Sequence, residues 1–373
     1  MGNMQLTAIV LMTLLTLKLL LLPVRVATDA VLDRARWLMV VSTALLGVQF
    51  LLQLSLGLRA LGVTQAVMVN LIFFIPCSWL TSLAVLYLQQ QGRISKVDKY
   101  MGLVVWIVIL AILGIAASID GKPLMTYSDE LYHAEIISSC LYACMQGHYA
   151  YRQATNLRAM SNALHNYFDR NQDSMLRWMQ MSVVILVVLA LMVPALIFIH
   201  SWWLAVFGAF FIFGLFYLVD SFCSYAVSSA PAKMREAERS EELAATAVHS
   251  EENEEEQREL MERVEYLVEQ WLEKGKYLKN GMKLPNAAMS IGIPQYQLST
   301  WLRNKNMKYS EWMTTLRIEE AKRILATHTD WSNETIAQHC GFNDRSYFHK
   351  KFKEVTGMSP ADFQASLGMT NED

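Results

Sequence analysis

Residues 345–353 combine long hydrogen-bond donors with aromatic residues in a helical pattern. Tyr347, Phe348 and Phe352 recur on or near one face of a helix, and we expect that face to pack inward. The opposite face then carries Arg345, Ser346, His349, Lys350 and Lys353. Side chains of these types can reach phosphate oxygens and the edges of bases. The pattern therefore predicts contact with a nucleic acid.

A short helix and a tight turn are expected to position these donors. The inner stripe of the short helix is Ile336, Ala337 and Cys340. Gly341 can adopt the positive φ of a turn, and Asp344 or Asn343 can cap the helix that follows. This order is the helix-turn-helix arrangement. The alternative is an ordinary helical hairpin with a solvated charged face, but it does not need Gly-Phe, Tyr-Phe, Phe-Lys and Ser-Pro together.

A second, weaker copy of the pattern lies upstream, with Gly292 at its turn. Its predicted inner residues are Ala287, Ala288, Ile291, Leu298, Trp301 and Leu302. Its predicted outward residues are Gln295, Gln297, Ser299, Thr300 and Arg303. Between the copies runs an expected helix with Ser310 as its N-cap and Leu316, Ile318, Ala321 and Leu325 as its buried stripe. Two units joined by one helix can enter successive major grooves about 34 Å apart.

The last hundred or so residues resemble the DNA-binding domain of the AraC/XylS family of bacterial transcription regulators. The resemblance rests on RIEEAKRIL at 317–325 and IAQHCGFNDRSYFHKKFKEVTGMSP at 336–360, and it covers about 30% of the chain. It implies two helix-turn-helix units, with DNA sequence read mainly by the second helix of each. The first unit departs from the family pattern, because Pro294 stands where Ser or Thr usually caps and the helix is poor in arginine.

The N-terminal half has a different composition. The whole chain is 53% hydrophobic and 18% charged, with a mean hydropathy of +0.23. Several stretches contain no Asp, Glu, Lys or Arg, and a bilayer span needs about 20 apolar residues. The predicted spans are 5–23, 37–58, 63–88, 101–119, 131–151, 179–199 and 202–226. The alternative is a large soluble bundle of buried helices, which rarely lacks charge for so long.

Loop charge predicts the orientation of these spans. The joining segments 24–36, 89–100 and 152–177 hold ten Lys and Arg residues, and the alternate segments hold two. This asymmetry places the N-terminus outside and the C-terminus in the cytoplasm. The first residues lack the basic start and cleavage pattern of a signal peptide. The expected location is the bacterial inner membrane, with multiple spans.

Polar residues within the predicted spans are candidates for signal detection, since burying them in lipid is costly. They include Lys18, Asn70, His148 and Asp220; Lys18 and Asp220 fall towards cytoplasmic ends, where snorkelling is the alternative. His133 and Glu135 can line an outward-facing pocket or lie at the interface. Cys140 and Cys144 share a helix face without further ligands, so no metal site is predicted. All five cysteines are expected to be reduced thiols.

Charge also divides the C-terminal part. Residues 234–273 hold 14 acidic and 4 basic residues, whereas residues 274–353 hold 14 basic and 6 acidic residues. Residues 232–273 can form a nearly continuous helix. Its apolar seam is Leu260, Val264, Leu267 and Trp271. The seam fits either a dimerising coiled coil or the first helix of the next domain lying on that domain's core.

The predicted fold is all-α: a seven-helix transmembrane bundle followed by a cytoplasmic helical domain with two helix-turn-helix units. The expected domains are residues 1–228, an acidic helical linker at 229–258 and an AraC-like domain at 259–373. The expected function is that of a membrane-anchored, one-component transcription regulator, without enzymatic activity or cofactor. The expected partners are double-stranded DNA and the bilayer, with RNA polymerase, a second copy and a membrane-borne ligand or protein as further candidates. The alternative is a multi-span receptor or transporter-like protein whose basic tail binds protein or anionic lipid.

Overall fold

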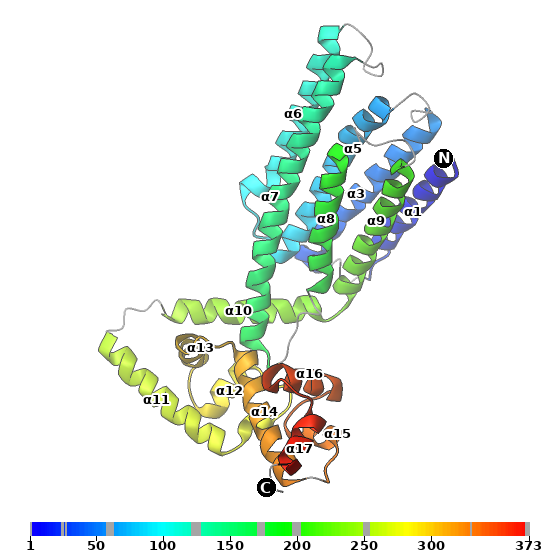
Figure 1. Cartoon of the computed structure of the whole chain (residues 1–373). Coiled ribbons are helices and arrows are strands. Elements are labelled where there is room, and N and C mark those ends of the chain that lie inside the picture. The colour runs from blue at the N-terminus through cyan, green and yellow to red at the C-terminus, as the bar shows by residue number, and fades with distance from the viewer. Residues whose placement is uncertain are drawn as a thin grey trace. The chain divides into compact units, whose positions relative to one another are not determined.

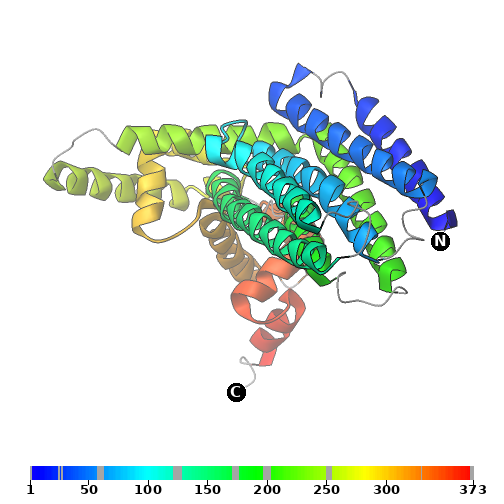
Figure 2. The same ribbon diagram turned by 90° about the horizontal axis from the view of Figure 1, so that it is seen from above.

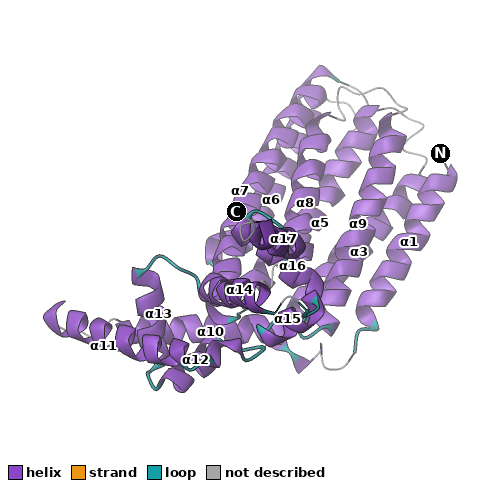
Figure 3. Ribbon diagram, turned by 60° about the horizontal axis from the view of Figure 1, so that its bottom comes forward, coloured by secondary structure: helices purple, strands orange, loops and turns teal. Residues whose placement is uncertain are grey.

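The structure is a computed structural model that describes residues 2–23, 26, 28–56, 63–120, 128–169, 176–195, 203–248, 254–328 and 330–369. All regular secondary structure in these ranges is helical, which confirms the all-α prediction (Figure 3). One isolated antiparallel bridge joins Phe168 to Lys283. The chain divides into two compact units: residues 1–159 with 175–231, and residues 160–174 with 232–373.

The first unit is a bundle of helices that lie side by side (Figures 1 and 2). Its helices are α1 (Gly2–Leu20), α3 (Ala30–Ser55), α5 (Val63–Gln89), α6 (Lys96–Asp120), most of α7 (Asp129–Tyr167), α8 (Arg177–Ala195) and α9 (Trp203–Val227). Each begins and ends near one of the predicted spans, except that α7 continues well beyond residue 151. The chain carries Asp29 as the N-cap of α3, where its carboxylate accepts from the Val31 and Leu32 amides.

Four stretches of the described residues are long and apolar enough to cross a membrane: Ala30–Ser55, Met68–Gln89, Lys96–Ile119 and Gly208–Val227. Gln5–Leu20 of α1 and Arg177–Leu189 of α8 are shorter apolar helices. Helix α7 is not among these candidates, and its sequence includes charged and histidine residues. Length and composition therefore indicate four spans, and seven spans remain a prediction.

The bundle exposes apolar side chains in rows along its helices. On α1, Leu6, Val10, Leu14 and Leu17 recur about once per turn and are 55%, 52%, 57% and 47% exposed. Leucine and valine in such a row are unfavourable in water, and contiguous exposed apolar surface marks a site of contact with protein or membrane. The outer face of α1 is thus suited to an apolar environment.

Polar residues on neighbouring helices of the bundle contact one another. Lys18 of α1 forms an ion pair with Asp220 of α9. The Asn70 side-chain oxygen accepts hydrogen bonds from Gln49 at 2.7 Å and Gln53 at 3.1 Å. Within the described residues all five cysteines are free of disulfide bonds.

The second unit contains the end of α7 and the rest of the chain. Its other helices are α10 (Ala230–Val248), α11 (Glu254–Glu273), the short 3₁₀ helix η2 (Lys276–Leu278), α12 (Leu284–Ile291), α13 (Gln295–Asn304), α14 (Tyr309–Thr327), α15 (Asn333–His339), α16 (Arg345–Thr356) and α17 (Pro360–Met369). Two local predictions differ from the structure. Helix α14 begins at Tyr309 with Lys308 as its N-cap, so Ser310 lies inside the helix and is buried. Helices α10 and α11 run in different directions (Figure 1), so these two parts of 232–273 do not share one axis; residues 249–253 between them lie outside the described residues.

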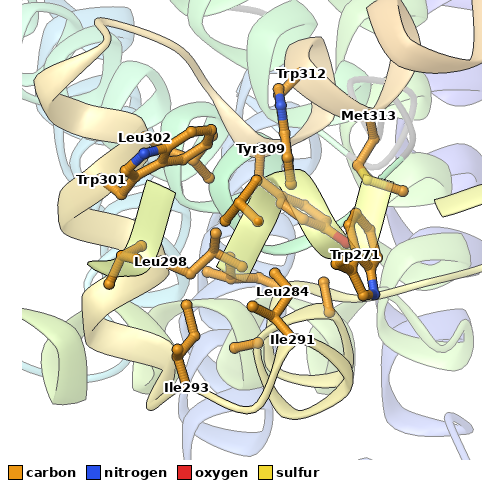
Figure 4. Close-up of a cluster of buried hydrophobic side chains, with 14 of the residues drawn as sticks. Trp271, Leu284, Ile291, Ile293, Leu298, Trp301, Leu302, Tyr309, Trp312 and Met313 are labelled. Atoms are coloured by element: carbon orange, nitrogen blue, oxygen red, sulfur yellow. The ribbon is translucent and has the colours of Figure 1, made fainter. Parts of the chain in front are cut away.

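Helix α11 packs its apolar stripe against the core of its own domain. Val264, Val268 and Trp271 are buried there together with residues of α12, α13 and α14. The Trp271 and Trp312 rings stack with centroids 5.8 Å apart, and Trp301 meets Trp312 edge-on at 5.5 Å (Figure 4). Of the two interpretations of the apolar seam, the structure supports the one in which this helix lies on the next domain's core.

Candidate nucleic-acid interface

Helices α15 and α16 form a compact pair around a buried apolar core. The Ser332 hydroxyl caps α15 by accepting from the Thr335 amide, and Asp344 caps α16 by accepting from the Ser346 amide at 2.7 Å. Ile336, Ala337 and Cys340 are buried as predicted. Burial raises the pKa of the Cys340 thiol to about 12, so it packs as a neutral group.

Gly341 determines the angle between these two helices. Its φ is +81°, a left-handed conformation that other L-residues rarely adopt. A Cβ at this position would lie 2.3 Å from the Leu278 carbonyl oxygen and 3.1 Å from Nε of Arg317. Only glycine therefore allows the turn to lie against η2 and α14.

The outward face of α16 carries donors, and its inward face carries aromatic rings. Phe348 and Phe352 are fully buried, with ring centroids 5.7 Å apart. Arg345, Ser346, Lys350 and Lys353 are exposed, and His349 is half-buried. Lys350 lies 3.9 Å from the Glu354 carboxylate, a distance at which an exposed pair constrains the side chain little. The structure brings all five predicted residues to one helix, with the arginine and two lysines accessible.

Helices α12 and α13 form a second pair, joined through Gly292 at φ +91°. Leu298, Trp301 and Leu302 of α13 are buried as predicted. The outward residues Gln295, Gln297, Ser299 and Thr300 are only half-exposed, and Arg303 is exposed. This face is therefore less accessible and less basic than that of α16.

Helix α10 contributes to the lower exposure, because it lies next to α13 at Gln295. The Gln295 amide donates hydrogen bonds to the Ser240 hydroxyl and, at 3.4 Å, to its carbonyl oxygen. Gln295, Ser299 and Arg303 line one wall of a cavity of about 210 Å³. Ser240 and Glu241 of α10 and Asn166 of α7 line the same cavity, and the Asn166 amide donates to Glu241 at 3.3 Å.

The end of α7 is joined to the same unit by a buried ion pair. Arg317 of α14 lies 3.0 Å from the Asp169 carboxylate, and the two side chains are 2% and 3% exposed. The guanidinium also donates to the carbonyls of Tyr277 at 3.1 Å and Lys279 at 2.8 Å. These contacts fix α14, the segment around η2 and the residues just after α7 to one another.

Lys283 makes a second set of contacts, which link the start of α12 to α10 and to the end of α7. Its ammonium pairs with both carboxylate oxygens of Glu236 in α10, at 2.7 and 2.8 Å. It also lies 5.7 Å from the Tyr167 ring centroid and 5.5 Å from that of Phe168. The Lys283 ammonium holds the pKa of Glu236 below its usual value. Burial, with a further contribution from Glu236, raises the pKa of Tyr167 to about 12.

The two residues predicted to line a signal pocket are not brought together. His133 is exposed on α7, and its Nδ1 lies 2.6 Å from the Asp129 carbonyl oxygen. Glu135 is 1% exposed, and one of its carboxylate oxygens is buried without a hydrogen-bond partner among the described residues. They therefore occupy different faces of α7. No cluster of three or more potential metal ligands occurs among the described residues.

Comparison with known proteins shows that the C-terminal region is similar to helix-turn-helix domains of transcription regulators. A family model described as a helix-turn-helix domain matches residues 287–366, which run from within α12 through α16. The arabinose operon regulatory protein of Escherichia coli is 41% identical over 83 residues, 22% of this chain and 28% of the relative. The transcriptional activator RhaS of Yersinia pestis is 30% identical over 103 residues, 27% of this chain and 37% of the relative. The regulatory protein PocR of Salmonella typhimurium is 25% identical over 92 residues, 24% of this chain and 30% of the relative.

The chain thus spans about a third of the length of these curated relatives. No solved structure matches it significantly.

Proposed function

We propose that this chain, whose C-terminal region is a helix-turn-helix domain of the AraC type, is a membrane-anchored bacterial one-component transcription regulator. The observation that carries the proposal is α16, where exposed Arg345, Lys350 and Lys353 are backed by the buried Phe348 and Phe352. Such a helix can enter the major groove, with its cations on phosphates and base edges.

Both helix pairs are proposed to act as helix-turn-helix units, with α13 and α16 as the helices that enter DNA. The second helix-turn-helix pair, α15 and α16, is proposed to make most of the base contacts, because α16 presents more accessible cations than α13. Arg345 and His349 lie one turn apart on its outward face, so they contact neighbouring base pairs. Lys350 and Lys353 contact the phosphate backbone, which contributes affinity without sequence preference.

Arg345→Ala is expected to weaken binding to a selected DNA site by ~1–3 kcal/mol, or about 5- to 150-fold, because it removes a bidentate base contact. Lys353→Ala should weaken binding to all sequences and reduce the slope of log affinity against log salt by about 0.9. The measurement is a gel shift with full-length protein in detergent, on a site selected from random DNA.

Arg258→Ala is the control, since this exposed arginine of α11 lies outside both outward faces and pairs only loosely with Glu262 at 3.9 Å. Unchanged affinity in both test variants would contradict the assignment. Wild-type protein that shows no preference among DNA sequences would favour the alternative, a tail that binds protein or anionic lipid.

The N-terminal unit is proposed to hold the regulator at the inner membrane with seven spans, the N-terminus outside and the DNA-binding domain in the cytoplasm. The apolar row on α1 and the four apolar stretches support membrane insertion. The orientation is supported by loop charge, because the joining segments proposed to be cytoplasmic hold ten Lys and Arg residues and the others hold two. The signal would then come from a membrane-borne ligand or protein. RNA polymerase and a second copy of the chain are further proposed partners.

Control of DNA binding is proposed to act through α10. The major groove is about 12 Å wide and accommodates one helix of about 10–12 Å diameter. With α10 hydrogen-bonded to Gln295, the outward face of α13 cannot enter the groove. A signal that favours separation of α10 from α13 would then make the first helix-turn-helix pair, α12 and α13, available to DNA.

Ser240→Arg is expected to raise the affinity for the selected DNA site by about 5- to 150-fold, the usual range for coupling between two sites. Ser240 is 7% exposed, so an arginine cannot be accommodated while α10 lies on α13. The measurement is again a gel shift with the full-length protein. Leu243→Arg is the matched control, because it adds the same charge at an exposed position on the same helix. Equal effects of the two variants would argue against masking and for simple charge attraction.

A further inference from the structure

A cavity of about 550 Å³ lies in the first unit among α3, α5 and the segment that leads into α6. Its lining includes Arg34 near the start of α3, Tyr87 near the end of α5 and Lys99 near the start of α6. Trp37, Val41 and Leu83 contribute apolar walls. The basic and apolar parts are separated along the helices, since Val41 lies two turns beyond Arg34, about 10 Å along α3.

The basic end of the cavity has an uncompensated positive charge. The Arg34 guanidinium donates to the Tyr87 hydroxyl at 2.9 Å, and the Lys99 ammonium lies 5.2 Å from the Tyr100 ring centroid. Neither cation forms an ion pair with a carboxylate among the described residues. The charge is therefore available to an anion.

The neighbouring acids are engaged by other cations. Asp33, next to Arg34, pairs with Arg36. Asp98, next to Lys99, accepts from Arg152 at 2.8 Å and lies 3.0 Å from the His148 ring nitrogen. Each acid is thus paired with a group other than Arg34 or Lys99.

The hydroxyl of the tyrosine at the basic end lies next to the Gly92 turn. Gly92 has φ +82°, and a Cβ there would lie 3.1 Å from the Tyr87 hydroxyl oxygen. Because no side chain occupies this space, the hydroxyl lies beside both the turn and the Arg34 guanidinium. The polar group is therefore positioned by the fold.

The other end of the cavity opens to an apolar surface. Trp37 and Val41 are 49% and 44% exposed. Tryptophan and tyrosine are enriched where membrane hydrocarbon meets the polar headgroups, and basic pockets between spans on the cytoplasmic side bind anionic headgroups. Cations above an apolar wall match a ligand that has a negatively charged head and a hydrocarbon tail.

We propose that this cavity binds an anionic phospholipid of the cytoplasmic leaflet. The phosphate lies between Arg34 and Lys99 and accepts from the Tyr87 hydroxyl, and an acyl chain follows the Trp37 and Val41 side. The lipid joins α3, α5 and α6 at their cytoplasmic ends. This proposal rests on the proposed insertion of the first unit in a membrane.

The test is native mass spectrometry of the full-length protein in a neutral detergent, titrated with phosphatidylglycerol or with phosphatidylcholine of the same acyl chains. Wild-type protein should bind phosphatidylglycerol more tightly. The double variant Arg34→Gln/Lys99→Gln should bind it roughly 30-fold more weakly, given about 1 kcal/mol for each cation. The control Lys96→Gln/Arg158→Gln removes two exposed cations outside the cavity and should retain the wild-type affinity.

Three results would overturn the proposal: equal binding of the two lipids, equal losses in the two double variants, or complete displacement of the lipid by soluble glycerol phosphate. The last would indicate a site for free phosphate compounds. Fractionation of cells separates this failure from that of membrane insertion. Protein that alkaline carbonate removes from membranes would contradict the anchoring itself, whereas protein that stays in the membrane without lipid preference would contradict only the lipid site.

Discussion

Gly341→Ala is expected to destabilise the α15–α16 pair by about 3 kcal/mol. A left-handed backbone costs a non-glycine residue ~1–2 kcal/mol, and forcing a methyl group into a packed site costs ~1–3 kcal/mol. The methyl group would lie 2.3 Å from the Leu278 carbonyl oxygen, which is backbone and cannot rotate away. The measurement is hydrogen exchange of the α15 and α16 amides in the full-length protein, which gives the free energy of local opening.

Gly292→Ala is the matched control, because Gly292 occupies the corresponding turn of the first pair at φ +91° with no atom within 4 Å of the added Cβ. This variant should lose ~1–2 kcal/mol of stability, which is only the cost of the left-handed backbone for a non-glycine residue. DNA binding by the Gly341 variant should fall with its fraction of folded domain. Equal losses in the two variants would mean that the contact with Leu278 relaxes at little cost.

Asp169→Asn is expected to destabilise the second unit by ~3 kcal/mol, at the lower end of the cost of breaking a buried ion pair. Both side chains are almost fully buried, so solvent screens the loss very little. The Arg317 guanidinium would keep its hydrogen bonds to the Tyr277 and Lys279 carbonyls, which limits the penalty. Thermal unfolding of the detergent-solubilised protein, together with exchange of α14 amides, measures the effect.

Glu354→Gln is the control for loss of an ion pair at the surface. Glu354 lies 2.7 Å from Lys351 and is 46% exposed, so its removal should cost under ~1 kcal/mol. The double variant Asp169→Asn/Arg317→Met should lose less than the sum of the two single variants, because neither charge then remains buried alone. A loss in Asp169→Asn no larger than that in Glu354→Gln would contradict the role of the pair.

The outward face of α16 could be predicted from sequence because local patterns determine it. The spacing of Phe348 and Phe352 identifies the buried side of the helix, the pair Asn343 and Asp344 narrows its start to two positions, and Gly341 identifies the preceding turn. Each signal spans only a few residues and depends on helix periodicity, capping or backbone freedom. The same holds for the buried stripe of α13 at Leu298, Trp301 and Leu302.

The sequence carried no comparable local signal for contacts between distant segments. Asp169 and Arg317 are far apart in sequence, and nothing near either residue indicates the other. Ser240 follows no pattern that would direct it to Gln295. The predicted N-cap at Ser310 was wrong because a favourable capping residue competes with packing, and burial of Tyr309 and Ser310 extends the helix to Lys308. The nearly continuous helix considered possible for 232–273 does not follow one axis, because helical propensity does not determine how α11 packs on Trp312.

The short connection between α9 and α10 has a consequence for where regulation can occur. Helix α9 ends at Val227 and α10 begins at Ala230, so two residues separate them. Two extended residues reach only about 7 Å. In a membrane-inserted chain, α10 therefore starts at the bilayer surface, and the protein cannot diffuse through the cytoplasm to find an operator. Under the proposed anchoring and DNA binding, the chromosomal site must come to the membrane, and its occupancy then depends on how often that locus visits the cell periphery as well as on affinity.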